Sequence, residues 1–567
     1  MKKLAKILSI AFAATMAASA FAGCGGMGRD KVGTDKPVDV TKSQLKVSNY
    51  EGGYGRAWLD EAALRFEEKY KDYEFEPGKK GVQVHVDSAK DGKAGETFLS
   101  GVTSTDFHVI ITEDAFYYDV VTKKIAADIT DIVMTETLSD YGENVTIESK
   151  MDGALKSFFK TGQNKYYALP HYEDFYCITY DRDLFNEKGL WISETGTYVK
   201  PNKEGKFTVT LSKGPDNLPN TYDDGLPATY DEFFALCKEM ADNKGVTPFT
   251  CSGQYISMVT AMMSQLWADY EGKEDFQKIF SFEAPMEVID TLSGNGTMDA
   301  QGKYSTTKTV ETFTGENAWE AYNQAGKAAA LEFAKRMVSD SDFYHSNMFS
   351  NDIDNIRAQG NYLISALENK PVAFLIDGVW WENEAEDAGT YGLLEAEYDN
   401  AGRKDRNFAL LPLPKATAAQ LGEKRTMTAK LKSLMFINAA YNNNENALKM
   451  AKEFMQFLHT DEELQNFSVT TSALKPFNYS IPTNKMTDMS AFGKDVVSTR
   501  SNTNCETVYM VSNHSFYINN ADSFDPAEAF RSADGQDPID LFKKNPSWTV
   551  KTVFDKIQAY RKTLRFN

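Results

Sequence analysis

Short apolar runs alternate with amphipathic helical segments along this chain, and this alternation constrains its fold more than any other feature. Residues 45–49 have strand character, glycines at 52, 53 and 55 allow a tight turn, and residues 59–70 place apolar side chains on one helical face. Residues 82–86 alternate like a half-buried strand, and residues 107–112 form a continuous apolar run of the kind that a parallel sheet buries on both faces. The pattern predicts a doubly wound α/β fold.

The same pattern continues in the second half of the chain. Thr229 with Glu232, and Thr460 with Glu463, have the spacing of a capping box, which predicts that a helix begins at each site. Residues 434–438 are predicted to form a strand, and residues 446–459 carry apolar side chains at helical spacing.

Size and charge limit the function classes. The chain has 567 residues, 42% of them hydrophobic and 25% charged, which is typical of a globular protein with three to four domains or two large lobes. Its 61 Lys and Arg residues against 81 Asp and Glu give a net charge of -20. This charge repels phosphate backbones and anionic lipid, so nucleic acid is not expected as a partner.

The N-terminus has the features of a secretory signal over residues 1–23. Lys2, Lys3 and Lys6 precede an uncharged run that is shorter than the roughly 20 residues of a membrane-spanning helix. The segment from Phe21 to Cys24 resembles the bacterial lipoprotein box, which implies that Cys24 is acylated, for example with palmitate, and becomes the new N-terminus. Residues 24–43 are then a lipidated flexible linker. An ordinary signal peptide cleaved nearby is the alternative.

No metal or cofactor site is indicated by the cysteine and histidine spacing, so no cofactor is expected. The four later cysteines are interpreted as core thiols or one disulfide bridge. Residues 191–228 are rich in Gly, Pro, Asn and Asp and are expected to be an insertion that forms a hairpin. The side-chain oxygens in this segment are a weak candidate for a calcium site, and the alternative is that they form Asx turns. They belong to Asp216, Asn217, Asn220, Asp223 and Asp224.

Enzyme signatures are absent from the sequence. It contains no GxSxG, HExxH or GxxxxGK[ST] motif, and its six histidines are scattered. We therefore expect a protein that is not an enzyme. A glycosidase-type carboxylate pair stays open, because such pairs are brought together only by folding.

Aromatic and acidic residues follow the predicted strands directly, where ligands bind in open α/β sheets. Carboxylates accept hydrogen bonds from sugar hydroxyls, and flat rings pack on the C–H faces of a pyranose. These residues therefore favour a carbohydrate ligand; they are Tyr50, Glu51, Glu113, Asp114, Asp377, Trp380 and Trp381.

Several stretches resemble the extracellular solute-binding proteins of bacterial ABC transporters, in the large family 1 group of maltose-type sugar-binding lipoproteins. Residues 125–131 (IAADITD) are similar to the family's "G-x-L-x-D-L-T-D". Residues 165–170 (KYYALP) with 180–185 (YDRDLF) match its "Y-G-L-P … Y-N-K-D-L-F" pattern. Residues 227–233 (PATYDEF) and 374–380 (FLIDGVW) resemble two later motifs, and the likeness extends to about residue 470.

The resemblance implies two α/β lobes of the type II periplasmic-binding-protein kind, with a ligand cleft between them. Residues 44–170 with 345–430 would form lobe one, and 171–344 with 431–567 lobe two. The cleft would also receive His171, Tyr172, Asp174 and Trp267. The family further implies a monomer that closes on its solute, is anchored to the extracellular face of the cell membrane, and delivers the solute to ABC transporter permease subunits.

Two alternatives share these residues. A binder of polyamines or other cationic solutes on the same scaffold would use the carboxylates with Trp380 as a cation-π wall. A secreted glycan-cleaving enzyme would use the same rings and acids but would not return its ligand intact.

Overall fold

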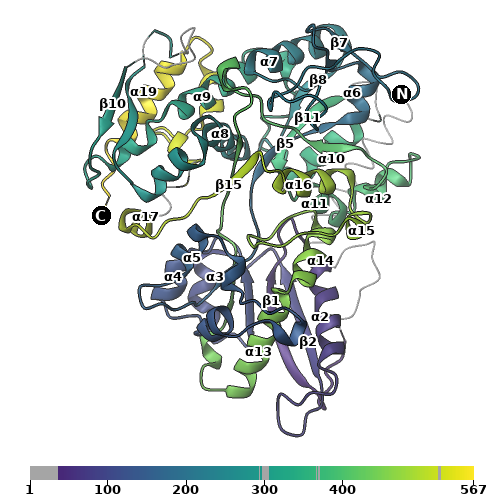
Figure 1. Ribbon diagram of the computed structural model, residues 1–567, viewed down its shortest axis with the longest axis vertical. Helices are drawn as coiled ribbons and strands as arrows, with labels where there is room; N and C mark the ends of the chain where they lie inside the picture. Colours follow the sequence, from purple (N-terminus) through teal and green to yellow (C-terminus); the bar gives the residue numbers. More distant parts are fainter. Residues whose placement is uncertain are drawn as a thin grey trace.

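The computed structural model describes residues 36–292, 294–296, 306–365, 367, 371–520, 525 and 527–566. These residues form two lobes, each built around its own sheet (Figure 1). The predicted signal at residues 1–23 and the acylation site Cys24 lie outside the described residues. In the described part of the chain, no helix is both long enough and apolar enough to span a bilayer.

The first lobe contains a five-stranded sheet. Its order is β2 (Val82–Ala89), β1 (Ser43–Tyr50), β3 (Val109–Thr112), β14 (Leu434–Ile437) and β4 (Leu169–Pro170). β1 is parallel to β2 and β3, whereas β14 is antiparallel to β3 and β4. All four residues of β3 are buried, as its continuous apolar run predicts. The helices of this lobe are α2 (Ala57–Lys69), α3 (Gly95–Gly101), α4 (Tyr117–Thr122), α5 (Gly153–Phe159), α13 (Glu445–Leu458) and α14 (Asp461–Thr471).

The second lobe contains a four-stranded sheet. Its order is β12 (Phe408–Leu410), β5 (Tyr176–Asp181), β11 (Val372–Gly378) and β8 (Thr247–Thr250). β11 is parallel to β8 and antiparallel to β5. The larger helices around it are α7 (Tyr230–Glu239), α8 (Ser257–Ser281), α9 (Ala325–Met337), α10 (Asn355–Ser365), α11 (Trp381–Asp387) and α16 (Ala491–Arg500). Both predicted helix starts are confirmed, because Thr229 and Thr460 accept hydrogen bonds from the amides of Glu232 and Glu463.

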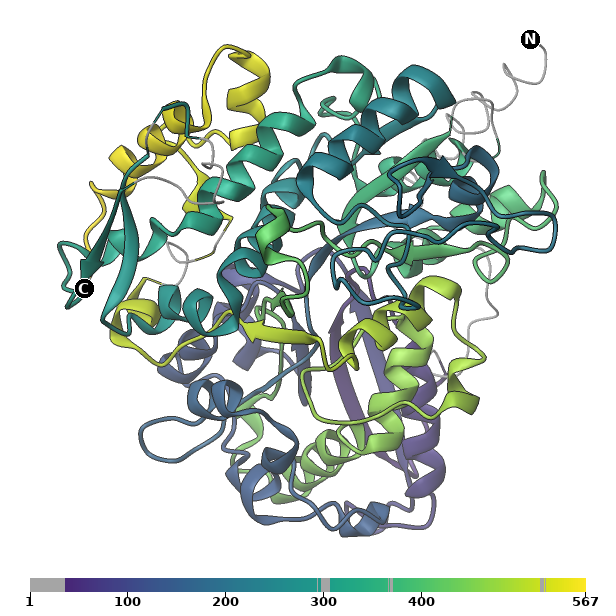
Figure 2. The same cartoon turned by 45° about the horizontal axis from the view of Figure 1, so that its top comes forward.

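Smaller elements complete the second lobe. The C-terminal helices α18 (Pro538–Lys544) and α19 (Val550–Arg561) pack against α9, and Figure 2 shows them beside the long helices of this lobe. Further elements are α6 (Arg182–Lys188), α12 (Thr390–Glu395), α15 (Thr483–Met486), α17 (Ser515–Asn519), β9 (Met286–Thr291), β10 (Thr306–Val310), β13 (Arg425–Ala429) and β15 (Cys505–Tyr509). The expected hairpin of the insertion is confirmed as β6 (Trp191–Ile192) paired with β7 (Tyr198–Val199).

The described chain passes between the lobes three times, and the crossing segments are hydrogen-bonded to one another. The first runs from β4 to β5, the second from β13 to β14, and the third leaves α14. The amide of Lys430 donates to the carbonyl of Asp174 at 2.9 Å, and the amide of Glu173 donates to the carbonyl of Leu474 at 2.8 Å. The three segments therefore form one connected junction between the lobes.

Strand pairing corrects the expected division of the chain. Residues 345–430 were expected in lobe one, but β11 and β12 pair with β5 in the second sheet. Residues 431–567 were expected in lobe two, but β14 pairs with β3 and β4 in the first sheet. The reason is that the hydrophobic pattern of a strand does not show which of two sheets it joins, and this chain passes between the lobes more than once. Of the described residues, lobe one therefore consists of 36–170 together with about 433–471.

The four cysteines in the described part of the chain are free thiols and form no disulfide bridge. Cys177, Cys237 and Cys251 are buried, and Cys505 is partly exposed. Of the two alternatives left open by the sequence, the core-thiol interpretation holds for the first three.

Candidate functional site

Six of the predicted residues gather where the two lobes meet, next to the crossing segments. Tyr50 ends β1, Glu113 and Asp114 follow β3, and Trp380 follows β11. Tyr172 and Asp174 lie in the first crossing segment. The six are connected by a hydrogen bond, ring contacts and electrostatic interactions given below, so residues that follow strands of both sheets come together at this junction.

The aromatic side of this site is centred on Trp380. Its ring contacts Tyr176 edge-on at 5.2 Å and Tyr54 at 6.0 Å between centroids, and Tyr54 in turn lies 4.0 Å from the ring of Tyr172. Trp380 and Tyr176 are partly exposed, whereas Tyr54 is buried. The parts of these two rings that remain exposed are aromatic surface of the kind that can pack on the C–H face of a sugar.

Two glycines allow this packing. A Cβ atom added at Gly53 or at Gly378 would lie 2.2 Å from the Trp380 ring. No side chain fits at such a distance, so both positions need glycine for the indole to lie flat between them. Gly53 belongs to the first lobe and Gly378 to the second, which places Trp380 across the junction.

The acidic side of the site contains two carboxyls with perturbed pKa values. Burial, followed by the charges of Asp174 and Asp114, holds the pKa of Glu113 well above its usual range, and Tyr172 donates its hydroxyl hydrogen to Glu113. Burial also raises the pKa of Asp174 to about 6, although nearby Lys430 opposes the shift. Oδ1 of Asp174 is buried and has no hydrogen-bond partner among the described residues. It can accept a hydrogen bond from a ligand hydroxyl.

Lys430 adds a positive charge that the sequence reading did not identify. Its Nζ lies 2.9 Å from Oδ2 of Asp525 and 5.6 Å from the centroid of the Tyr176 ring. The carboxylates of Asp525 and Asp174 raise its pKa against the effect of burial. The site therefore holds both signs of charge.

A cavity of about 700 Å³ adjoins this cluster. It shares Asp114 and Lys430 with the cluster, and its far wall carries Phe116 and Tyr517. Figure 1 shows α17 close to α4 on this side of the molecule, so both lobes contribute to the cavity. The volume lies within the range of small-molecule sites in proteins.

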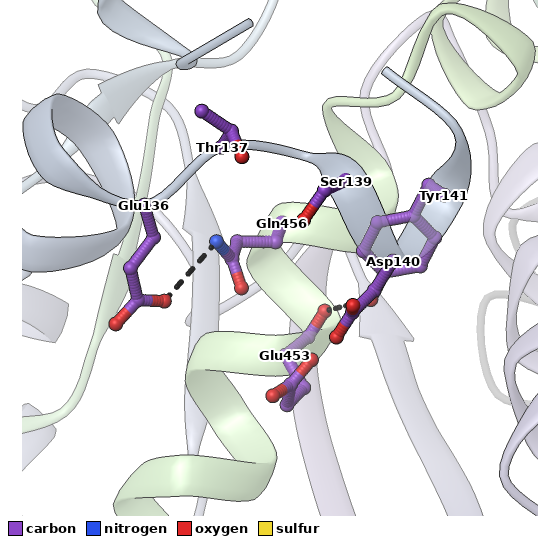
Figure 3. A pocket seen from close by; sticks show the side chains of 7 residues that line it. All are labelled: Glu136, Thr137, Ser139, Asp140, Tyr141, Glu453 and Gln456. Carbon is purple, nitrogen blue, oxygen red and sulfur yellow. Dashed lines mark hydrogen bonds between the residues drawn. The ribbon is translucent and has the colours of Figure 1, made fainter. Parts of the chain in front are cut away.

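A second hollow, of about 260 Å³, lies on the first lobe alone (Figure 3). Glu136, Tyr141, Glu453 and Gln456 line it; Gln456 donates to Glu136 at 3.4 Å, and Tyr141 donates to the carbonyl of Glu453 at 3.2 Å. It contains none of the predicted residues and no side chain of the second lobe.

The remaining predicted residues lie away from the ligand-accessible surface, except Glu51, which is partly exposed beside Tyr50. Trp267 is fully buried in α8 and donates to Gln324 at 2.8 Å. Trp381 is fully buried because the segment begins a helix there, and successive helical side chains point in different directions, so it turns inward while Trp380 stays at the surface.

Two further predicted residues are buried beside the site. Asp377 is 1% exposed, accepts a hydrogen bond from Gln359 at 3.0 Å, and has its pKa raised to about 7 by burial and by the charge of Glu384. His171 is buried in the first crossing segment, where its Nδ1 is 2.8 Å from Nζ of Lys475; burial lowers the pKa of His171 well below its usual value. Both residues are therefore buried next to the site and do not line its surface.

Tyr255 is a site residue that the sequence analysis missed. It precedes α8 and is 43% exposed, and its proximity contributes to the raised pKa of Tyr50, after burial and the nearby carboxylates. Tyr255 comes shortly after β8, a parallel strand of the second sheet. The rule that identified Tyr50 applies equally to Tyr255.

The carboxylates of the calcium candidate in the insertion accept hydrogen bonds from nearby backbone amides, and Asp216 does so in an Asx turn. Asp216 accepts a hydrogen bond from the amide of Leu218 at 2.7 Å, and Asp224 from the amide of Asn220 at 2.7 Å. Asp223, whose pKa burial raises to about 6, accepts from the amide of Asp216 at 3.0 Å. Asn217 and Asn220 have positive φ angles, as in tight turns. Among the described residues, no group of three or more His, Cys, Asp and Glu side chains could hold a metal ion.

Comparisons with known proteins agree with this architecture. Residues 65–494 match the family model described as "Bacterial extracellular solute-binding protein". The fold is similar to that of RafE in complex with raffinose, with 12% identity, a TM-score of 0.51, and coverage of 92% of this chain and 99% of that one.

Two other solved structures show similar agreement. Maltose-bound MalE3 of T. maritima has 13% identity and a TM-score of 0.50, and a chitin oligosaccharide binding protein has 14% identity and a TM-score of 0.50. In both cases 92% of this chain and 99% of the other are covered. A search of curated proteins gave no match.

Proposed function

Because the chain belongs to the bacterial extracellular solute-binding protein family, we propose that it captures a carbohydrate between its two lobes and delivers it to an ABC importer. The observation that carries the sugar assignment is that Trp380 and Asp174 lie in the same junction between the lobes. A partly exposed indole lies in the same junction as a buried carboxylate oxygen that has no hydrogen-bond partner in the described chain. A pyranose matches both, since it has an apolar face and a rim of hydroxyl donors.

The binding mechanism follows from the position of these groups. Glu113 and Tyr50 come from the first lobe and Trp380 from the second, so a solute contacts all of them only when the lobes are close together. The solute then stabilises the closed arrangement by the difference between its affinities for the closed and open states. No covalent step is required.

Charge balance favours a neutral solute over a polyamine. The carboxylates of Asp174 and Asp525 are already opposed by Lys430, and that of Glu384 by Lys90, whose Nζ is 2.9 Å from Glu384 Oε1. A cationic solute would have to compete with these lysines. The polyamine alternative predicts an affinity that falls steeply with salt, whereas neutral sugar binding depends little on salt.

The proposed location is the extracellular face of the membrane, with an acylated Cys24 as the anchor. In this arrangement, residues 25–35 together with the segment from Lys36 to β1 would connect the lipid to the first lobe. Mass spectrometry of the mature N-terminus tests the anchor, and Cys24→Ala should release the protein from membranes. Recovery of the Cys24→Ala protein in the membrane fraction would contradict the proposal.

A thermal-shift screen tests the ligand class. We expect at least one neutral mono- or oligosaccharide to raise the melting temperature, whereas spermidine and putrescine leave it unchanged. The hit should then reduce the radius of gyration in small-angle X-ray scattering and be recovered intact after incubation. A sugar that binds without compaction would refute closure, and a cleaved sugar would favour the glycan-cleaving enzyme.

A further inference from the structure

An ion pair joins the two lobes at the edge of the candidate site. Nζ of Lys90 lies 2.9 Å from Oε1 of Glu384. Lys90 directly follows β2 of the first sheet, and Glu384 lies in α11, which follows β11 of the second sheet. Figure 1 shows β2 in the lower lobe and α11 in the upper lobe. The pair therefore spans the junction.

The two partners are held very differently. The Glu384 side chain is 7% exposed, and its Oε2 accepts hydrogen bonds from Gln359 at 3.0 Å and from Asn355, both on α10 of the same lobe. Lys90 is 51% exposed, and its Nζ has Glu384 as its ion-pair partner. Glu384 is thus held in place by its own lobe, and the exposed side chain of Lys90 reaches it from the other lobe.

The same turn of α11 makes a second contact with the first lobe. Nδ2 of Asn383 donates to the carbonyl of Gly53 at 3.0 Å. Gly53 also packs against Trp380, the residue that precedes α11. The Lys90–Glu384 pair, the Asn383 hydrogen bond and the packing of Trp380 against Gly53 therefore all require that the lobes lie close together at this point.

We propose that Lys90 and Glu384 form an interlobe latch, an ion pair that exists only when the lobes are closed and that sets how much of the unliganded protein is closed. This inference rests on the lobe closure proposed above, but not on the identity of the solute. On opening, Lys90 returns to water while Glu384 keeps only its amide donors. Glu384, followed by the carboxylates of Glu113 and Glu51, raises the pKa of Lys90 against the effect of burial.

The matched control is Lys80, at the other end of β2. Lys80 pairs with Asp72 at 2.8 Å, and both residues belong to the first lobe. Lys80 precedes β2 and Lys90 follows it, so Lys80→Gln removes the same charge next to the same strand without removing an interlobe contact. Lys90→Gln is chosen over a Glu384 substitution because Lys90 is exposed, so the variant is expected to fold.

Distances between spin labels at Glu74→Cys and Lys203→Cys, one in each lobe, report closure in the full chain without added sugar. Cys24→Ser and Cys505→Ser are present in every protein, because the other three cysteines are buried. We expect Lys90→Gln to lower the ratio of closed to open molecules about two- to fivefold at 20 mM NaCl. High salt should move the otherwise unchanged protein toward the Lys90→Gln distribution, and Lys80→Gln should match the unchanged protein.

Identical distance distributions for Lys90→Gln and the unchanged protein at low salt would overturn the latch, as would an equal shift in Lys80→Gln. These outcomes are read without any sugar. A sugar screen that fails would overturn the proposed ligand class and leave the latch measurement interpretable.

Discussion

Arg500 donates hydrogen bonds to both carboxylate oxygens of Glu173, from Nη2 to Oε1 at 3.0 Å and from Nε to Oε2 at 3.0 Å. Glu173 is 1% exposed and also accepts a hydrogen bond from the hydroxyl of Tyr509 at 2.7 Å. Glu173 belongs to the first crossing segment, whereas Arg500 ends α16 and Tyr509 ends β15. The ion pair therefore fastens the crossing segment to the second lobe.

Loss of this arginine should destabilise the protein strongly. Arg500→Met leaves the Glu173 carboxylate buried without its cation, and breaking a buried pair in this way costs about 3–5 kcal/mol. Denaturant unfolding measures the change in the free energy of unfolding. Arg336→Met is the matched control, because Arg336 has the same 29% side-chain exposure but its partner Asp231 is 91% exposed. We expect the control to cost less than about 1 kcal/mol; equal losses would show that burial of Glu173 does not decide the effect.

Removal of the indole should weaken sugar binding. Trp380→Ala is expected to cost about 1–3 kcal/mol of binding free energy, since the lost ring face no longer covers the apolar face of the sugar. Isothermal titration calorimetry with a sugar identified by the thermal-shift screen measures this change. Trp548→Ala, in the segment before α19, removes another partly buried indole outside the site and should leave affinity unchanged. Unchanged affinity with lower thermal stability in Trp380→Ala would assign the ring to the core.

An added methyl group at Gly53 should also weaken sugar binding, because it displaces the Trp380 ring. The Cβ atom of Gly53→Ala would meet Cδ1 of Trp380 at 2.2 Å, so the indole must move. Overpacking of this kind costs about 1–3 kcal/mol, and the shifted ring should also bind sugar more weakly. Gly162→Ala is the control, because no atom lies within 4 Å of its added Cβ. Tight sugar binding by Gly53→Ala would show that the position of the indole is not critical.

The sequence predicted elements better than it predicted their assembly. The buried run at β3 and the capping residues Thr229 and Thr460 act locally, so their patterns sufficed. The sheet joined by β14 depends on where the chain crosses between lobes, which no local pattern encodes. Likewise, the adjacent Trp380 and Trp381 look equivalent in the sequence, and only the start of α11 between them separates a surface ring from a core ring.

The carboxyl of Asp174 should make stability depend on pH in a defined direction. Its pKa in the folded protein is about 6, above the ordinary value of 3.8, so the folded state holds the proton more tightly than the unfolded state does. The contribution of Asp174 to the free energy of unfolding is therefore complete below about pH 4 and falls as the pH rises toward 6. Against Asp174→Asn, which cannot ionise, the unchanged protein should lose up to about 3 kcal/mol over this interval.

Sugar binding should follow the opposite trend in the same pH range. Only the ionised Asp174 carboxylate has every lone pair free to accept hydroxyl hydrogen bonds, so affinity should rise as pH increases through 6 and then level off. Asp174→Asn should flatten this rise. Asp72→Asn is the control, because that exposed carboxyl has its pKa lowered by Lys80 and lies in the first lobe outside the candidate site. A rise in affinity that survives in Asp174→Asn would assign the proton to another group; Glu113, whose pKa is also raised by burial and by the charge of Asp174, is the nearest such candidate.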